Sequence, residues 1–232
     1  MAQAREHFDN LNLDLMYALP QQTLEQAQAD LRIAIELEPS HLSLYHLTLE
    51  PNTVFAKYPP SLPDDDVSAQ MQDCLVSQAA GAGYQQYEVS AYARAGRKAR
   101  HNLNYWQFGD YLGIGAGAHS KLSFPQRIVR QERYKQPKSY MEQCLRGTPI
   151  SEQHEIAHNE LGFEFMLNTL RLVDGFPVSL FAERTGTHIV TIQAALEQAE
   201  QRGLLYRDHQ MIRATELGQR FLNDLQQLFL PD

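Results

Sequence analysis

The residues best suited to chemistry lie together in the stretch 84–120. Within it, the hexapeptide HNLNYW (101–106) places one imidazole beside two carboxamides and two large aromatic side chains. Imidazole is a common axial ligand of heme iron, and aromatic rings can cover a porphyrin face. A histidine among aromatic residues is also a frequent core residue with satisfied hydrogen bonds. The residue types alone therefore leave two interpretations of His101, an iron ligand or a core residue.

Three glycines alternate a few residues further on, in the segment GIGAGAHS (113–120). Glycine inside a strand usually marks the close approach of a ligand or of another backbone. The spacing Gly113-x-Gly115-x-x-Ala118 also fits a dinucleotide fingerprint, but that motif requires a helix to follow. The next residues, SKLSFP (120–125), start a helix poorly, so we exclude a dinucleotide site. The segment predicts either a ligand-facing wall or a bulged strand beside an aromatic core.

Five motifs resemble, in chain order, those of the radical-SAM coproporphyrinogen-oxidase-like proteins. They are NLDLMYALPQQT (12–23), SLYHLTLEPNT (43–53), YEVSAYA (87–93), HNLNYW (101–106) and GDYLGIGAGAHS (109–120). The HNxxYW pattern is similar to the heme-chaperone branch of this family rather than to the authentic oxidase. The family's CxxxCxxC motif, which carries the iron–sulfur cluster, is not found in the sequence. We therefore expect the chain to be the C-terminal part of such a protein.

The resemblance implies three cofactors: heme, S-adenosylmethionine and a [4Fe-4S] cluster, the last only in the full-length protein. It implies heme contacts at His101, Tyr105 and Trp106, although the two aromatic residues are either porphyrin-packing or structural. It implies S-adenosylmethionine contacts at Asp14, His46, Gly113, Gly115 and His119. His46 is expected to contribute its backbone. One departure is Ala18, where the family usually has a glycine before Leu-Pro.

Asp14 has a second interpretation, because it lies inside the apolar run 11–19 and a carboxylate there needs partners. It is either an acid of the barrel core, bonded to a neighbouring strand, or a ligand contact on the inner wall of the barrel. The resemblance favours the ligand contact.

The resemblance implies a heme-binding chaperone that transfers heme to an acceptor protein. The first alternative is an oxygen-independent coproporphyrinogen III oxidase, in which a 5′-deoxyadenosyl radical starts oxidative decarboxylation of propionate side chains. The second alternative is a winged-helix interaction module without a cofactor. No catalytic residue is assigned, and the fragment by itself is expected to be inactive.

Bulk composition limits the classes of partner that the chain is expected to bind. The chain has 232 residues, a net charge of −8 and 43% hydrophobic residues, which suit a sizeable core and disfavour general binding to nucleic acid or to anionic membranes. Its apolar runs are shorter than the roughly 18 residues that a membrane span needs. The low cysteine content, Cys74 and Cys144, is typical of the reducing cytoplasm. Peripheral membrane association is expected only through a partner.

Hydrophobic periodicity predicts an α/β fold. Apolar strands are expected at 11–19, 42–49 and 87–92, with helices between them that begin near Thr23 and after the aspartates 64–66. This order is typical of a parallel sheet or barrel, and the resemblance implies the later strands of an incomplete β/α barrel. We predict a partial barrel at 1–122, a connecting segment at 123–150 with an edge strand at 128–130, and a C-terminal domain at 151–232.

The C-terminal domain is predicted to be winged-helix-like, because helices are followed by a hairpin near 203–213. Residues 151–232 contain six arginines, no lysine and twelve acidic residues. A protein that binds duplex DNA needs cations to neutralise phosphates. We therefore expect a lid or docking domain that does not bind nucleic acid.

We predict that this chain alone does not carry an iron–sulfur cluster. Such clusters are usually held by several thiolates, and two cysteines seventy positions apart do not supply three. Anaerobic reconstitution followed by iron and sulfide analysis should give far less than one cluster per chain. Stoichiometric cluster on the isolated chain would contradict the prediction.

Overall fold

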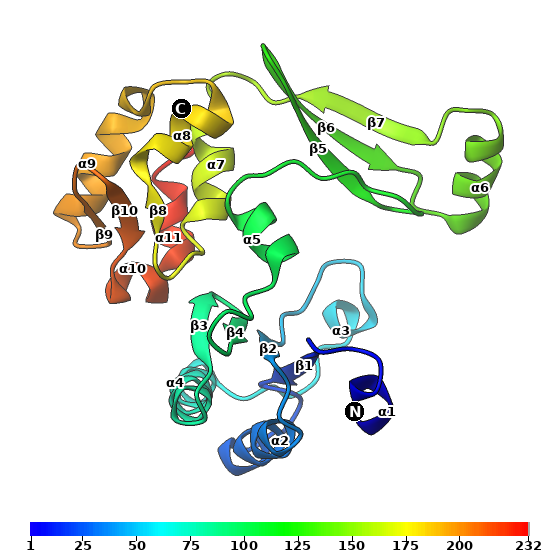
Figure 1. Cartoon of the computed structure of the whole chain (residues 1–232), viewed down its shortest axis with the longest axis vertical. Coiled ribbons are helices and arrows are strands. Elements are labelled where there is room, and N and C mark those ends of the chain that lie inside the picture. The colour runs from blue at the N-terminus through cyan, green and yellow to red at the C-terminus, as the bar shows by residue number, and fades with distance from the viewer. Residues whose placement is uncertain (232) are drawn as a thin grey trace. The chain divides into compact units, whose positions relative to one another are not determined.

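The computed structural model describes residues 1–231 and divides into two compact units, Met1–Ala99 and Arg100–Asp232. Each unit has its own hydrophobic core and its own sheets (Figure 1). The domain boundaries expected after residues 122 and 150 stay a prediction. One three-stranded sheet, however, contains residues from both sides of each boundary. No helix among the described residues is long and apolar enough to span a membrane.

The first unit contains a four-stranded sheet in the order β1-β2-β4-β3. Its strands are β1 (Asn12–Tyr17), β2 (His41–His46), β3 (Gln85–Glu88) and β4 (Ala91–Ala93). β1 and β2 pair in parallel, as expected of a strand–helix–strand unit, whereas β4 is antiparallel to both β2 and β3. The single strand predicted at 87–92 is therefore wrong. The chain reverses over residues 89–90, where the Glu88 carboxylate accepts a hydrogen bond of 2.9 Å from the backbone N–H of Ser90.

Helices α2 (Leu24–Glu36) and α4 (Asp65–Gly81) pack together in the core of this unit. Both begin where the sequence predicted. Thr23 and Gln26 form a capping box, and Asp64 caps α4 through the backbone N–H of Val67. Two short helices, α1 (Ala2–Arg5) and α3 (Val54–Lys57), lie before β1 and after β2 in the chain.

The second unit begins with α5 (Arg100–Trp106) and an antiparallel sheet in the order β5-β6-β7. The strands of this sheet are β5 (His119–Phe124), β6 (Arg127–Arg133) and β7 (Ile150–Glu155), and helix α6 (Pro137–Leu145) lies between β6 and β7 in the chain. The predicted edge strand at 128–130 is thus the centre of a longer strand, paired on both sides. The glycine segment 113–118 is a loop rather than a strand, since Gly115 and Gly117 have positive φ angles of 114° and 72°.

The remaining elements form the winged-helix-like order that the sequence predicted. They are α7 (Leu161–Thr169), β8 (Phe176–Pro177), α8 (Val178–Thr185), η1 (Ile189–Ile192), α9 (Gln193–Gln201), β9 (Leu205–Arg207), β10 (Met211–Ala214), α10 (Glu216–Arg220) and α11 (Leu222–Gln227). The strands pair in the order β8-β10-β9. Phe165 lies at the centre of the core, in edge-to-face contact with Phe176 and Phe181 at ring separations of 5.2 and 5.1 Å.

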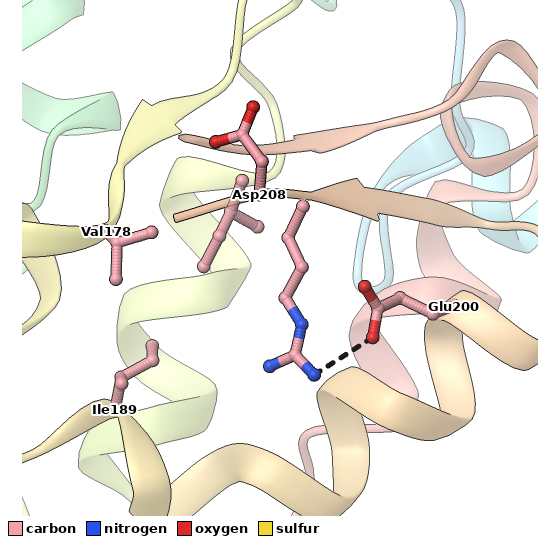
Figure 2. Close-up of a pocket in the computed structure, with 6 residues that line it drawn as sticks. Val178, Ile189, Glu200 and Asp208 are labelled. Atoms are coloured by element: carbon pink, nitrogen blue, oxygen red, sulfur yellow. Dashed lines mark ion pairs between the residues drawn. The ribbon is translucent and has the colours of Figure 1, made fainter. Parts of the chain in front are cut away.

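An ion pair ties the β9–β10 hairpin to helix α9. Arg207 Nη2 lies 3.0 Å from Glu200 Oε2, and Arg207 Nη1 donates to Gln193 Oε1 at 2.9 Å. Figure 2 shows this pair beside a small cavity of about 240 Å³ whose apolar lining is Val178, Ile189 and Ile212. Arg207 is therefore engaged within the domain.

We predict that the C-terminal domain does not bind duplex DNA despite its winged-helix-like order. Its acidic balance repels phosphates, and Arg207 is held by Glu200. Titration of the chain with a fluorescent mixed-sequence duplex at low salt should show no saturable binding. Micromolar binding with a steep dependence on salt would contradict this prediction.

Candidate functional site

Helical geometry divides the HNLNYW hexapeptide into two faces. Leu103 and Trp106 lie three residues apart and pack against the core of the second unit. His101 and Tyr105 lie four residues apart, so they share a different face, and both are exposed, Tyr105 by 39%. Helix α5 is therefore anchored by one face and presents an imidazole and a phenol ring on the other.

Trp106 has the contacts of a structural residue. The Arg171 guanidinium lies over its indole ring, 4.2 Å from the ring centre, in a cation–π arrangement. Of the two open interpretations for this side chain, its contacts favour the structural one.

Tyr105 is held by a second tyrosine that sequence reasoning missed. The rings of Tyr105 and Tyr111 meet edge to face with their centres 4.7 Å apart. The Tyr111 hydroxyl accepts a hydrogen bond of 2.7 Å from Arg130, which also pairs with Glu164 of α7. Arg130 and Glu164 lie 19 and 53 residues beyond Tyr111, so no local pattern could have revealed this group.

Asn104 shapes the end of α5. Its side-chain Nδ2 donates to the carbonyl oxygen of Asp110 at 2.8 Å, and its backbone carbonyl accepts from Gly109 N at 2.7 Å. A methyl group on Gly109 would lie 2.1 Å from the Asn104 side chain, so only glycine fits this turn. Asn104 therefore directs the chain from α5 toward Tyr111.

A buried lysine fixes the same turn. Lys121 is 1% exposed, and its Nζ donates to the carbonyl of Phe108 at 3.0 Å and to Asp110 Oδ1 at 2.9 Å. Burial lowers the pKa of Lys121, although the Asp110 carboxylate opposes this shift. Partial burial would raise the pKa of Asp110, but hydrogen bonds from Ser123 and Lys121 outweigh it and lower that pKa. The pair stabilises the connection between α5 and the glycine loop.

The glycines at 113–117 are required by the backbone itself. A methyl group on Gly113 would lie 2.1 Å from the carbonyl oxygen of His119, and Gly115 and Gly117 have positive φ angles. The loop is also held by hydrogen bonds from Gly113 N to Ser120 Oγ (2.9 Å) and from Gly117 N to the carbonyl of Tyr134 (2.9 Å). The close approach signalled by these glycines is thus, at Gly113, that of another backbone.

The other predicted S-adenosylmethionine contacts fall in both units. Gly113, Gly115 and His119 belong to the second unit, where His119 is exposed on β5 with its Nδ1 3.7 Å from Glu132. Asp14 and His46 belong to the first, on neighbouring parallel strands. All three predicted heme contacts belong to the second unit.

On β1, side chains alternate, and the Asp14 carboxylate is exposed rather than enclosed in a core. It accepts a hydrogen bond of 2.7 Å from Asn12 Nδ2. The exposed His46 ring meets the Tyr17 ring edge to face at 5.3 Å. Ala18 has a positive φ of 56° and is buried, which explains physically why a glycine suits this position.

Within residues 1–231, no group of three or more histidine, cysteine or acidic side chains could hold a metal ion. Heme is different, because the porphyrin supplies most ligands of its iron and the protein adds an axial side chain. An exposed imidazole beside an aromatic surface fits that requirement, as His101 and Tyr105 are arranged on α5.

The chain is similar to several known proteins. Residues 156–229 match the family described as the HemN C-terminal domain. The chain is 46% identical to the heme chaperone HemW of Haemophilus influenzae, over 96% of the chain and 57% of that protein. It is 45% identical to the heme chaperone HemW of Escherichia coli, over 96% of the chain and 58% of that protein. The chain thus spans a little more than half the length of these curated relatives.

A solved structure is also similar. It is coproporphyrinogen III oxidase (HemN) from Escherichia coli, a radical SAM enzyme, with a TM-score of 0.77 and 20% sequence identity. The match covers 98% of this chain and 56% of that one, and at this identity it shows the fold alone.

Together these findings confirm the predicted fold class and the similarity of the chain to the coproporphyrinogen-oxidase-like family. Within that family, the relatives at 45% and 46% identity are heme chaperones of the HemW branch. This is the branch that the HNxxYW motif predicted.

We predict that Gly113→Ala lowers the free energy of unfolding by about 1–3 kcal/mol, because the new methyl group must push the backbone of His119 away. Chemical unfolding followed by circular dichroism measures this change. Gly81→Ala is the matched control: its methyl group meets open space at the end of α4, and it should stabilise by about 0.5–1 kcal/mol. Equal effects of the two substitutions would contradict the explanation.

Proposed function

We propose that this protein binds heme on the exposed face of α5, with His101 as an axial ligand, and that the complete protein passes the heme to an acceptor protein. The observation that carries the proposal is the division of the hexapeptide into two faces. Leu103 and Trp106 hold the helix in the core, which leaves His101 and Tyr105 available to a ligand. The similarity to heme chaperones supports the same conclusion.

The residues of this chain have distinct tasks in the proposal. Neutral imidazole donates an electron pair to iron, so His101 would bind the metal directly. Tyr105 offers an aromatic ring to the porphyrin, and its contact with Tyr111 limits the orientations of that ring before heme arrives. Binding then costs less conformational entropy than it would with a mobile side chain.

We propose that the complete protein also holds S-adenosylmethionine and a [4Fe-4S] cluster. Asp14 and His46, on adjacent strands of the first unit, are the proposed contacts of S-adenosylmethionine there. When bound, the cluster supplies one-electron chemistry. This chain would contribute polar contacts to S-adenosylmethionine. The proposed acceptor is another protein.

The competing function is oxidation of coproporphyrinogen, which the name of the structural neighbour suggests. That neighbour is 20% identical, whereas the heme chaperones are 45% and 46% identical over nearly the whole chain. An exposed imidazole on α5 also suits binding of an iron porphyrin better than binding of a metal-free one. Both observations favour the chaperone.

We expect His101→Ala to weaken heme binding by about 10-fold or more, because loss of a metal ligand removes at least about 1.4 kcal/mol. Titration of the chain with hemin, followed by the Soret band, measures the affinity. Since His101 is exposed, the melting temperature should change little. His154→Ala is the matched control, because it removes an exposed histidine of the same unit from strand β7.

The opposite pattern would contradict the proposal. A core histidine that lost its partners would lower stability by about 1–3 kcal/mol and leave heme affinity unchanged. Equal heme affinities for wild type, His101→Ala and His154→Ala would likewise remove His101 from the site.

A further inference from the structure

A chain of hydrogen bonds crosses the sheet of the first unit and ends at Asp14. Its inner members are buried: His41 is 3% exposed and Tyr87 is 1% exposed. His41 Nε2 lies 2.8 Å from the Tyr87 hydroxyl, and His41 Nδ1 lies 2.7 Å from Asn12 Oδ1. The amide nitrogen of Asn12 then contacts Asp14 Oδ1 at 2.7 Å. The chain connects strand β3 to strand β1 through β2.

The Asp14 carboxylate sets the direction of these hydrogen bonds. A carboxylate can only accept, so the Asn12 amide turns its nitrogen to Asp14 and its oxygen to His41 Nδ1. Because the amide oxygen also only accepts, His41 Nδ1 carries a proton. In a neutral imidazole with that proton on Nδ1, Nε2 accepts from the Tyr87 hydroxyl. The hydrogen-bond network therefore assigns the Nδ1–H tautomer to His41.

The Asn12 amide is held from both sides. His41 Nδ1–H donates to Asn12 Oδ1, and the Ser43 hydroxyl donates to the same oxygen at 3.2 Å. With its oxygen held by two donors, the amide turns its nitrogen toward the Asp14 carboxylate. The other tautomer would need an amide N–H from Asn12, and the Asn12 oxygen would then face the carboxylate of Asp14.

We propose that His41 and Tyr87 are positioning residues that orient the Asp14 carboxylate toward a ligand with hydroxyl or ammonium donors, of which S-adenosylmethionine is the proposed example. The inference rests on the proposed S-adenosylmethionine contact of Asp14. It adds that a buried network, rather than the strand alone, decides how that carboxylate is presented. Held in advance, the carboxylate loses less freedom when the ligand binds.

The tautomer can be tested on this chain by itself. In a nitrogen-15 NMR spectrum of histidine-labelled protein, His41 should show a protonated Nδ1 and an unprotonated Nε2. A protonated Nε2 with an unprotonated Nδ1 would overturn the proposal, because the Asn12 amide would then be reversed.

The positioning role is tested by S-adenosylmethionine affinity in the complete, cluster-loaded protein. His41→Leu should weaken binding about 3- to 10-fold, the range expected when one net hydrogen bond is lost. Asn12→Ala, which interrupts the chain at the exposed strand β1, should weaken binding by a similar factor. The double variant should be no weaker than either single one, since both break the same connection.

Tyr84→Phe is the matched control. Tyr84 is also 1% exposed, and its hydroxyl donates at 2.7 Å to the carbonyl of Pro39, outside this network. It should destabilise the first unit without changing S-adenosylmethionine affinity.

Two failures can be told apart through Asp14→Asn. If Asp14→Asn weakens binding while His41→Leu and Asn12→Ala behave like Tyr84→Phe, the positioning role is overturned and the Asp14 contact stands. If Asp14→Asn has no effect, the proposed contact is overturned, and the positioning role with it.

Discussion

The candidate heme surface depends on the burial of one face of α5. Leu103 and Trp106 enter the core that the winged-helix-like elements build around Phe165, and Arg171 covers the indole of Trp106. Because successive residues of a helix point in different directions, burial of these two positions forces His101 and Tyr105 outward. The winged-helix-like elements thus hold the helix that presents the imidazole.

The connection from α5 to the glycine loop shows a second constraint, the satisfaction of buried polar groups. Lys121 enters an apolar environment, where an unpaired ammonium would be costly, and Asp110 and the Phe108 carbonyl compensate it. The same carboxylate accepts from the backbone of Ser123. This pairing fixes the turn that brings Tyr111 against Tyr105. The hydrogen bonds of one buried lysine therefore help to position two tyrosine rings.

In the first unit, a chain of hydrogen bonds runs from the buried interior of the sheet to its exposed face. The parallel pairing of β1 and β2 sets Asn12 opposite His41 and Asp14 opposite Ser43. A buried histidine can then direct an exposed amide, and the amide a carboxylate. Both units present exposed polar or aromatic groups on a support of packed side chains, which is the arrangement that a binding site needs to keep its geometry.

Local sequence signals determined much of this protein: the capped starts of α2 and α4, the strand–helix–strand unit, the winged-helix-like order, the similarity to heme chaperones, and His101 as the residue to test. These follow from short-range periodicity, capping and motif spacing. Only the tertiary structure decided that residues 87–92 form a hairpin, that 113–118 is a loop, and that Trp106 faces the core. It alone brought Tyr111 to Arg130 and Glu164, and Tyr87 to His41. Such contacts join residues far apart in the chain, and their side-chain directions depend on packing and hydrogen-bond partners that no local pattern contains.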